Sequence, residues 1–388
     1  MPDSDPRDSL RQDLDYDKLI AQTSPALQRY IRTLELENAR LRQELLELRQ
    51  GAARRQRAES LREARADAPI SQLPTPRHPN DVMVLTITRR GLAKRTPLNE
   101  YSTQRRGGIG VFDILTARDD SAAHLAVTRE DASLLVLSSR GRAFCIPVDS
   151  LPLSEPRGRG ASLPERLLFT EEETVAAVLP LDAPRDTHNT VLIATANGWL
   201  RSLHRNYVGP HLQPGTLLSD PRRGGPPAAL ALSKGTGDVL LTLHSGAGYR
   251  FPERLIGREG VRGIQTHPDD WVVGLVGVES DDDEVLLVTA DGQGVRRQMA
   301  GFASNKSPGG QGKVIIKSDA LAGAARVRPG DEALCISSAA KIIRFAADEV
   351  PAKSGNVQGV SLLDIRGDSL AALAIAPLPV AAPAQEAA

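Results

Sequence analysis

A chain of 388 residues, 40% of them hydrophobic, is long enough to bury one large core or two small ones. Only 3% of the residues are aromatic, so the core must be aliphatic, and 48 basic residues balance 48 acidic ones. This balance excludes a uniformly basic nucleic-acid binder, although acidic faces can still offset a basic surface. No run of 18 apolar residues occurs and the N-terminus is acidic, so we expect a cytoplasmic protein without a signal peptide or a membrane span.

The N-terminal part of the chain combines a polar segment with a heptad repeat. Residues 1–23 hold six aspartates and are predicted to be disordered. Ser24 and Pro25 then suit the N-cap and first position of a helix over residues 24–66. The heptad d positions are Leu27, Leu34, Leu41 and Leu48, and the a positions are Ile31, Asn38 and Leu45. Leucine at d with one asparagine at a favours a parallel coiled-coil homodimer; the alternative is one amphipathic helix packed on its own domain.

The helical pattern continues into a basic stretch and ends in a linker. Residues 52–66 carry five arginines, which fit either a solvated helix or an arm that contacts phosphates. Four prolines in residues 67–80 predict a linker.

Residues 81–376 repeat one pattern six times. Each unit has an apolar strand, a small-residue turn, a second strand with basic residues and a glycine-containing loop. The turn residues are Gly91, Gly141, Gly198, Gly246, Gly292 and Ala340, at intervals of 46 to 57 residues. Six units of this length predict a mainly β fold, a six-bladed propeller-like disc. Residues 377–388, rich in alanine and proline, are predicted to be a disordered tail.

The loop of the first unit carries the most specific motif in the chain. Residues 104–110 read Gln104, Arg105, Arg106, Gly107, Gly108, Ile109 and Gly110. Arginine pairs bidentately with phosphate, and glycines let the backbone approach another surface closely. This loop resembles the gyrase-A box of the C-terminal DNA-wrapping domain of the bacterial DNA gyrase A protein. The family motif has lysine where this chain has Ile109, which removes one positive charge.

The resemblance implies a β-pinwheel, in which neighbouring blades exchange strands and duplex DNA wraps around the outer rim. It also implies that the box loop lies where the first and last blades meet, so its glycines could serve ring closure. The candidate DNA contacts are the basic residues of the second strands and loops: Arg105, Arg106, Lys94, Arg95, Arg157, Arg159, Arg201, Arg205, Arg296, Arg297 and Lys313.

Catalytic signatures are missing from the sequence. We find no ATP-binding motif and no breakage-reunion domain with its tyrosine, and we expect neither a cofactor nor a metal. The acidic runs 171–173 and 281–284 are interpreted as solvated loops. Cys145 and Cys335 lie in apolar runs, as small buried side chains do; a disulfide or redox pair is the alternative.

The sequence therefore predicts a non-catalytic, nucleoid-associated protein that binds or wraps duplex DNA without strong sequence preference. Its partners would be DNA, a second copy of the chain and a type II topoisomerase. Two other interpretations stay open: a protein-interaction platform that has lost DNA wrapping, and an accessory piece of a split topoisomerase.

Overall fold

The computed structural model describes residues 24–28, 31, 34, 82–182, 188–355 and 358–376. The chain divides into two compact units, Met1–Pro76 and Arg77–Ala388. In the first, residues 25–28, 31 and 34 are helical, and Ser24 Oγ accepts a hydrogen bond from the Leu27 N–H at 3.4 Å, as expected of an N-cap. The predicted coiled-coil residues Asn38, Leu41, Leu45 and Leu48 lie outside the described residues, so dimerisation stays a prediction.

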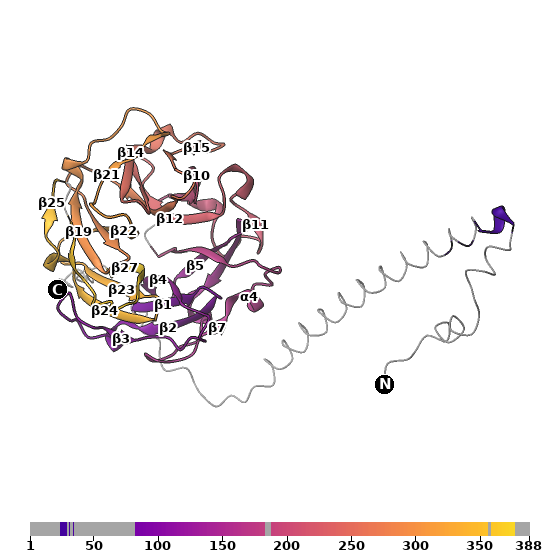
Figure 1. The fold of residues 1–388 in the computed structure, drawn as a ribbon, viewed down its shortest axis with the longest axis horizontal. Coiled ribbons are helices and arrows are strands. Elements are labelled where there is room, and N and C mark those ends of the chain that lie inside the picture. Colours follow the sequence, from indigo (N-terminus) through magenta and orange to yellow (C-terminus); the bar gives the residue numbers. More distant parts are fainter. Residues whose placement is uncertain are drawn as a thin grey trace, which may run out of the picture. The chain divides into compact units, whose positions relative to one another are not determined.

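The second unit is a ring of six mainly antiparallel sheets, called blades 1 to 6 in chain order (Figure 1). The first strands are β1 (Val82–Thr88), β5 (Ser133–Ser138), β9 (Thr190–Thr195), β13 (Asp238–Leu243), β18 (Glu284–Thr289) and β23 (Glu332–Ser337). The second strands are β2 (Leu92–Pro97), β6 (Arg142–Pro147), β10 (Trp199–His204), β14 (Ala247–Pro252), β19 (Gln293–Gln298) and β24 (Lys341–Ala346). The inner strands are β4 (Ala122–Arg129), β8 (Val175–Pro180), β12 (Pro227–Ser233), β17 (Val272–Val278), β22 (Leu321–Val327) and β27 (Leu370–Ala376). The six-bladed, mainly β prediction is thus confirmed for the described residues.

Tight turns join the first and second strands at the predicted positions. The five predicted turn glycines have φ between 76° and 82°, which a residue without a Cβ adopts at little cost. In the sixth turn Ala340 adopts φ 61°, a conformation that disfavours alanine. The turns of all six units therefore follow one backbone path, even where the residue is not ideal for it.

Blades 1 to 5 take their outer edge strands from the next unit in the chain, and blade 6 takes its strand from the first unit. These outer strands are β7 (Ala161–Ser162) on blade 1, β11 (Thr216–Leu217) on blade 2, β15 (Val261–Arg262) on blade 3, β21 (Lys313–Val314) on blade 4, β25 (Ala352–Lys353) and β26 (Val360–Ser361) on blade 5, and β3 (Val111–Phe112) on blade 6. Between two of these loops, β16 (Ile264–Gln265) pairs with β20 (Gly310–Gln311) in parallel. This is the strand exchange that the resemblance implied.

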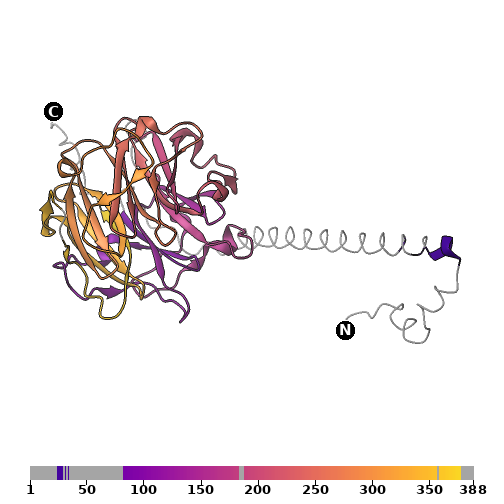
Figure 2. The same ribbon diagram turned by 45° about the horizontal axis from the view of Figure 1, so that its top comes forward.

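The exchange also closes the ring. β3 of the first unit pairs with β24 of the last, with Lys341 opposite Phe112 and Ile342 opposite Val111. Figures 1 and 2 show this contact as the indigo start of the disc lying beside its yellow end. The first and last units therefore hold each other through backbone hydrogen bonds.

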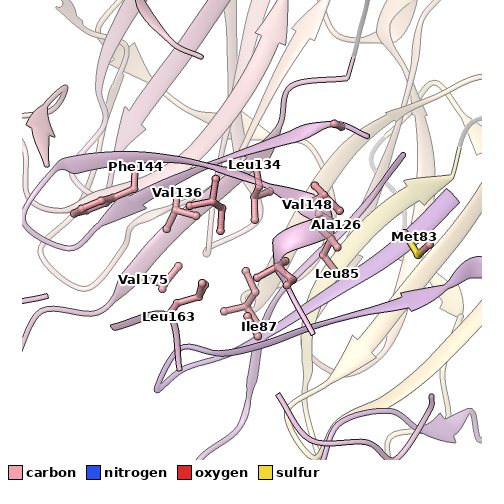
Figure 3. Packing of buried hydrophobic residues seen from close by; sticks show 14 residues of the cluster. Met83, Leu85, Ile87, Ala126, Leu134, Val136, Phe144, Val148, Leu163 and Val175 are labelled. Atoms are coloured by element: carbon pink, nitrogen blue, oxygen red, sulfur yellow. The ribbon is translucent and has the colours of Figure 1, made fainter. Parts of the chain in front are cut away.

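Six apolar clusters hold the blades together, one at each boundary between neighbours. Between blades 1 and 2, Leu85 and Ile87 of β1 pack with Leu134 and Val136 of β5 and with Phe144 of β6 (Figure 3). Full burial of a leucine or isoleucine side chain contributes roughly 1.5–3 kcal/mol. Because strand side chains alternate between two faces, each sheet supplies residues to both of its boundaries.

Short helical turns connect the strands. A 3₁₀ turn follows each second strand: η1 (Leu98–Glu100), η2 (Val148–Ser150), η3 (Arg205–Tyr207), η5 (Glu253–Leu255), η6 (Met299–Gly301) and η7 (Ala347–Glu349). The remaining turns are η4 (Pro221–Arg223) and the four-residue α4 (Leu163–Arg166). Among the described helices, none is both long and apolar enough to cross a membrane.

Candidate nucleic-acid interface

The box loop is built into the seam between the first and last units. The Gly107 N–H donates to the Leu362 carbonyl at 2.7 Å, and the Asp364 N–H donates to the Gly108 carbonyl at 2.9 Å. Gly110 has φ 71°, and a Cβ there would lie 2.7 Å from the Ile342 carbonyl oxygen. The backbone of this loop therefore helps to close the ring, as the glycines suggested.

The two box arginines have different surroundings. Arg106 Nε donates to the Glu349 carbonyl at 2.9 Å and Nη1 donates to the Ser361 carbonyl at 3.1 Å, so this side chain ties the loop to the last unit. Arg105 is exposed, and its side chain makes no hydrogen bond or ion pair with the described residues. Ile109 is 51% exposed. Of the two arginines, Arg105 is the one available to a phosphate.

Lys94, a predicted DNA contact, is completely buried. Its ammonium lies 2.7 Å from Asp113 Oδ1, and it donates to the carbonyls of Asp113 and Glu155 at 2.8 and 3.0 Å. Asp113 also accepts hydrogen bonds from Thr86 and Tyr101. Burial lowers the pKa of Lys94, and Asp113 opposes that shift. Lys94 is thus part of the interior of the disc, which corrects the prediction that it contacts DNA.

A second correction concerns Arg95 and Arg296, which were predicted to contact DNA but bind other parts of the disc. Both occupy the fourth position of a second strand. Arg95 Nε donates to the Leu151 carbonyl at 2.9 Å and its Nη1 pairs with Glu130 at 2.7 Å. Arg296 Nε donates to the Val350 carbonyl at 2.7 Å. Each of these arginines binds the unit that supplies the outer strand of its blade, and we call them interblade arginines. They are Arg95, Arg250, Arg296 and Arg344.

Three more predicted contacts point into the disc. Arg205 is 4% exposed, and its Nη2 donates to the Leu181 carbonyl at 2.6 Å. Arg297 is 3% exposed, donates to the Gly301 carbonyl at 2.9 Å, and has a pKa lowered by burial. Arg201 is half-buried and donates to the Leu218 carbonyl at 2.9 Å. These cations are not presented to a ligand at the rim.

The remaining predicted contacts are exposed. Arg157, Arg159 and Lys313 make no side-chain hydrogen bond or ion pair within the described residues. Sequence reasoning missed others at the same edge of the disc, all exposed: Arg258, Arg262, Lys306, Lys317 and Lys353. Arg262 donates a hydrogen bond to the Asn197 carbonyl at 3.4 Å. These residues lie in or beside the short outer strands, and the sequence alone does not show where those strands are.

Charge is concentrated in the loops that carry these outer strands. We define the edge segments as residues 101–114, 151–166, 208–224, 256–265, 302–317 and 350–365. Together they hold 13 lysines and arginines but only 6 aspartates and glutamates, whereas the whole chain has no net charge. The strand exchange places a short strand from each segment at the outer edge of a sheet. The segments that carry these edge strands are therefore basic as a set, and most acidic residues lie elsewhere in the sequence.

Other chemistry is not evident in the described part of the chain. No group of three or more His, Cys, Asp or Glu side chains there could hold a metal ion. Both cysteines are free thiols. The expectation of a solvated acidic loop fails at Glu173, which is buried and receives hydrogen bonds from Arg142 and Thr170.

The β region matches a known domain family. The model of the DNA gyrase C-terminal domain, described as a β-propeller, matches residues 83–129, 283–332 and 331–377. The chain is also 30% identical over 290 residues to the DNA gyrase A protein of Salmonella typhimurium. The chain therefore carries a DNA gyrase A C-terminal domain.

Further comparisons give the same family by sequence and the same fold by structure. The chain is 30% identical over 304 residues to the DNA gyrase A protein of Mycolicibacterium smegmatis, and the match covers 75% of the chain and 36% of that protein. A solved structure of a DNA gyrase A C-terminal domain superimposes with a TM-score of 0.67 at 20% identity, covering 76% of this chain and 99% of that one. The C-terminal domain of a DNA topoisomerase IV superimposes with a TM-score of 0.52 at 17% identity, covering 76% and 93%. The Salmonella match covers 72% of this chain and 33% of the relative, so the chain spans about a third of that protein's length.

Proposed function

We propose that this gyrase A C-terminal domain binds duplex DNA along the outer rim of its disc, largely without sequence preference. The observation that carries the proposal is the excess of cations in the edge segments of a chain with no net charge. Exposed lysines and arginines without partners among the described residues, such as Arg105, Arg157 and Lys313, can neutralise phosphates and release their counterions. Phosphate contacts position a duplex but carry no sequence information.

The ring geometry suits a bent duplex. The outer strands follow one another around the ring, so successive cations follow a curve (Figure 1). Bending a site of 20–30 base pairs by 40–90° costs roughly 1–6 kcal/mol, which several phosphate contacts can offset. The proposed role is non-catalytic: the domain would constrain DNA, or assist a type II topoisomerase, and a coiled-coil dimer would place two discs on one duplex.

A mobility-shift assay tests this function. The full chain is titrated onto linear duplex DNA of about 150 base pairs, close to the persistence length of DNA, at several salt concentrations. We compare the wild type with Arg157→Ala/Arg159→Ala and Lys313→Ala/Lys317→Ala. Each lost phosphate contact should lower the slope of log affinity against log salt by about 1.

The matched control removes two exposed cations away from the edge segments. Arg89 lies in the turn after β1 and Arg118 in the loop before β4, and both are exposed. Arg89→Ala/Arg118→Ala should leave the slope unchanged. Absence of binding at low salt, or an equal effect of the control, would overturn the proposal and favour a protein-interaction platform.

A further inference from the structure

The edge of blade 2 differs from the other edges in the state of its cations. Arg142, the first residue of β6, pairs with Glu173 at 2.5 Å. In edge segment 208–224, Arg222 pairs with Asp220 at 3.0 Å and Arg223 pairs with Glu259 at 3.3 Å. Each of these guanidinium groups already has a carboxylate as its counterion.

Apolar side chains occupy this edge in place of free cations. Leu217 of β11 is 54% exposed and lies opposite Arg142 in the sheet. Leu168 is 77% exposed, and its carbonyl accepts a hydrogen bond from Arg142 Nη2 at 3.3 Å. Tyr207, the last residue of η3 before β11, is 69% exposed. This sector of the rim is therefore locally neutral; exposed apolar side chains also occur at other edges, as at Phe112 and Val314, so the pairing of its cations is what sets it apart.

The other five edges each carry at least one exposed cation without an ion pair among the described residues. They are Arg105 on blade 6, Arg157 and Arg159 on blade 1, Arg258 and Arg262 on blade 3, Lys306, Lys313 and Lys317 on blade 4, and Lys353 on blade 5. DNA affinity of this kind comes from counterions released when cations neutralise phosphates. A cation already paired with a carboxylate must break that pair before it can contribute.

At blade 2 the cost of bending the duplex is not matched by new phosphate contacts. Continuing the duplex across this edge adds bending cost, and it adds no phosphate contact that is free of competition. Contact with this sector therefore costs free energy. At the other five edges, phosphate contacts offset the bending cost.

We propose that bound duplex DNA follows an open arc over the edges of blades 3, 4, 5, 6 and 1, and that both of its ends leave the disc at blade 2. The inference rests on the proposed function and adds the path of the DNA. The preferred ligand is then a duplex whose two arms diverge from one sector of the ring, rather than a duplex that encircles the whole rim.

Directed cleavage tests the path. The second residue of an outer strand occupies an equivalent position on each blade: Phe112, Ser162, Leu217, Arg262, Val314 and Ser361. Each is changed to cysteine in a full chain carrying Cys145→Ser, while the buried Cys335 is retained. A chelated iron reagent attached to the new thiol cleaves nearby DNA backbone. Leu217 and Val314 form the closest matched pair, at 54% and 50% exposure.

The outcomes separate the path from the function. We expect cleavage from five positions and loss of cleavage to background from Leu217→Cys. Cleavage from Leu217→Cys as strong as that from Val314→Cys would overturn the open arc and leave DNA binding intact. Cleavage from none of the six would overturn DNA binding at the rim and the arc with it.

A second measurement uses no reagent. Arg222→Ala/Arg223→Ala removes the two ion-paired cations of edge segment 208–224 and should leave the salt slope of DNA binding unchanged. Lys313→Ala/Lys317→Ala removes two from the blade 4 edge and should lower the slope by about 2. Equal reductions from the two double variants would contradict the arc.

Discussion

Replacing Lys94 separates a structural cation from a DNA contact. In the structure, the side chains of Lys94 and Asp113 are both fully buried, with Nζ 2.7 Å from Oδ1. Lys94→Ala leaves the Asp113 carboxylate in the interior with hydrogen bonds only from hydroxyl groups, from Thr86 and Tyr101. The interior then holds a charge without its counter-charge.

The expected cost follows from that burial. Breaking a buried ion pair by removing one partner destabilises a protein by about 3–5 kcal/mol. For a domain of this size, 1 kcal/mol corresponds to roughly 2 °C in Tm, so Lys94→Ala should lower Tm by about 6–10 °C. The carbonyls of Asp113 and Glu155 also lose their donor, which places the estimate toward its upper end.

Urea denaturation followed by circular dichroism measures this cost, and a double-mutant cycle checks its origin. Lys94→Met/Asp113→Asn replaces both charges with groups of similar size and should recover much of the loss. The salt slope of DNA binding should stay at the wild-type value in every folded variant. If Lys94→Ala were as stable as the wild type and lowered the salt slope by about 1, the residue would be a phosphate contact and this reasoning would be refuted.

Five other substitutions probe the ring. Arg344→Ala should cost about 3 kcal/mol in urea denaturation, because Arg344 pairs with a carboxylate and donates to two carbonyls of the first unit; Cys145→Ala, at the same strand position in blade 2, should cost under about 1 kcal/mol. Burial by itself raises the pKa of Glu173, but hydrogen bonds from Arg142 and Thr170 lower that pKa to about 2 from 4.5. Its stabilising contribution, up to about 2 kcal/mol after screening, is complete above pH 4.5 and lost as pH falls toward 2, so Glu173→Gln should flatten stability against pH in that range. Arg106→Ala should lower Tm and Arg105→Ala should lower only the salt slope; the reverse pattern would exchange the roles of these two residues.

The sequence predicted the number of units because glycine marks a turn that other residues enter at a cost. Gly91 and its four counterparts share one left-handed φ, and their spacing revealed the repeat. Ala340 fits the pattern only through its position, since its chemistry does not favour that conformation. The backbone geometry of the turns could therefore be predicted from the sequence.

Side-chain direction was less accessible. In β19, Arg297 takes the position that Phe251 holds in β14 and Phe345 holds in β24, both fully buried. Strand alternation places such a residue inside, so comparing the units column by column would have removed Arg297 and Lys94 from the candidate contacts. Basic character alone pointed to the rim.

The outer strands could not be predicted. Each has only two residues, too few for a periodic pattern, and each pairs with a strand of the preceding blade. Lys353 and Arg262 acquire their place on the rim only through this pairing. The most exposed cations were therefore among the hardest to assign from sequence.

The pairing of β3 with β24 also has a consequence for synthesis on the ribosome. Val111 and Phe112 are translated about 230 residues before their partners Lys341 and Ile342. At 5–20 residues per second, the first unit waits roughly 10–50 s with its loop unpaired. Over that interval the nascent disc is an open crescent, and translation speed sets how long its unsatisfied strand is available to other chains.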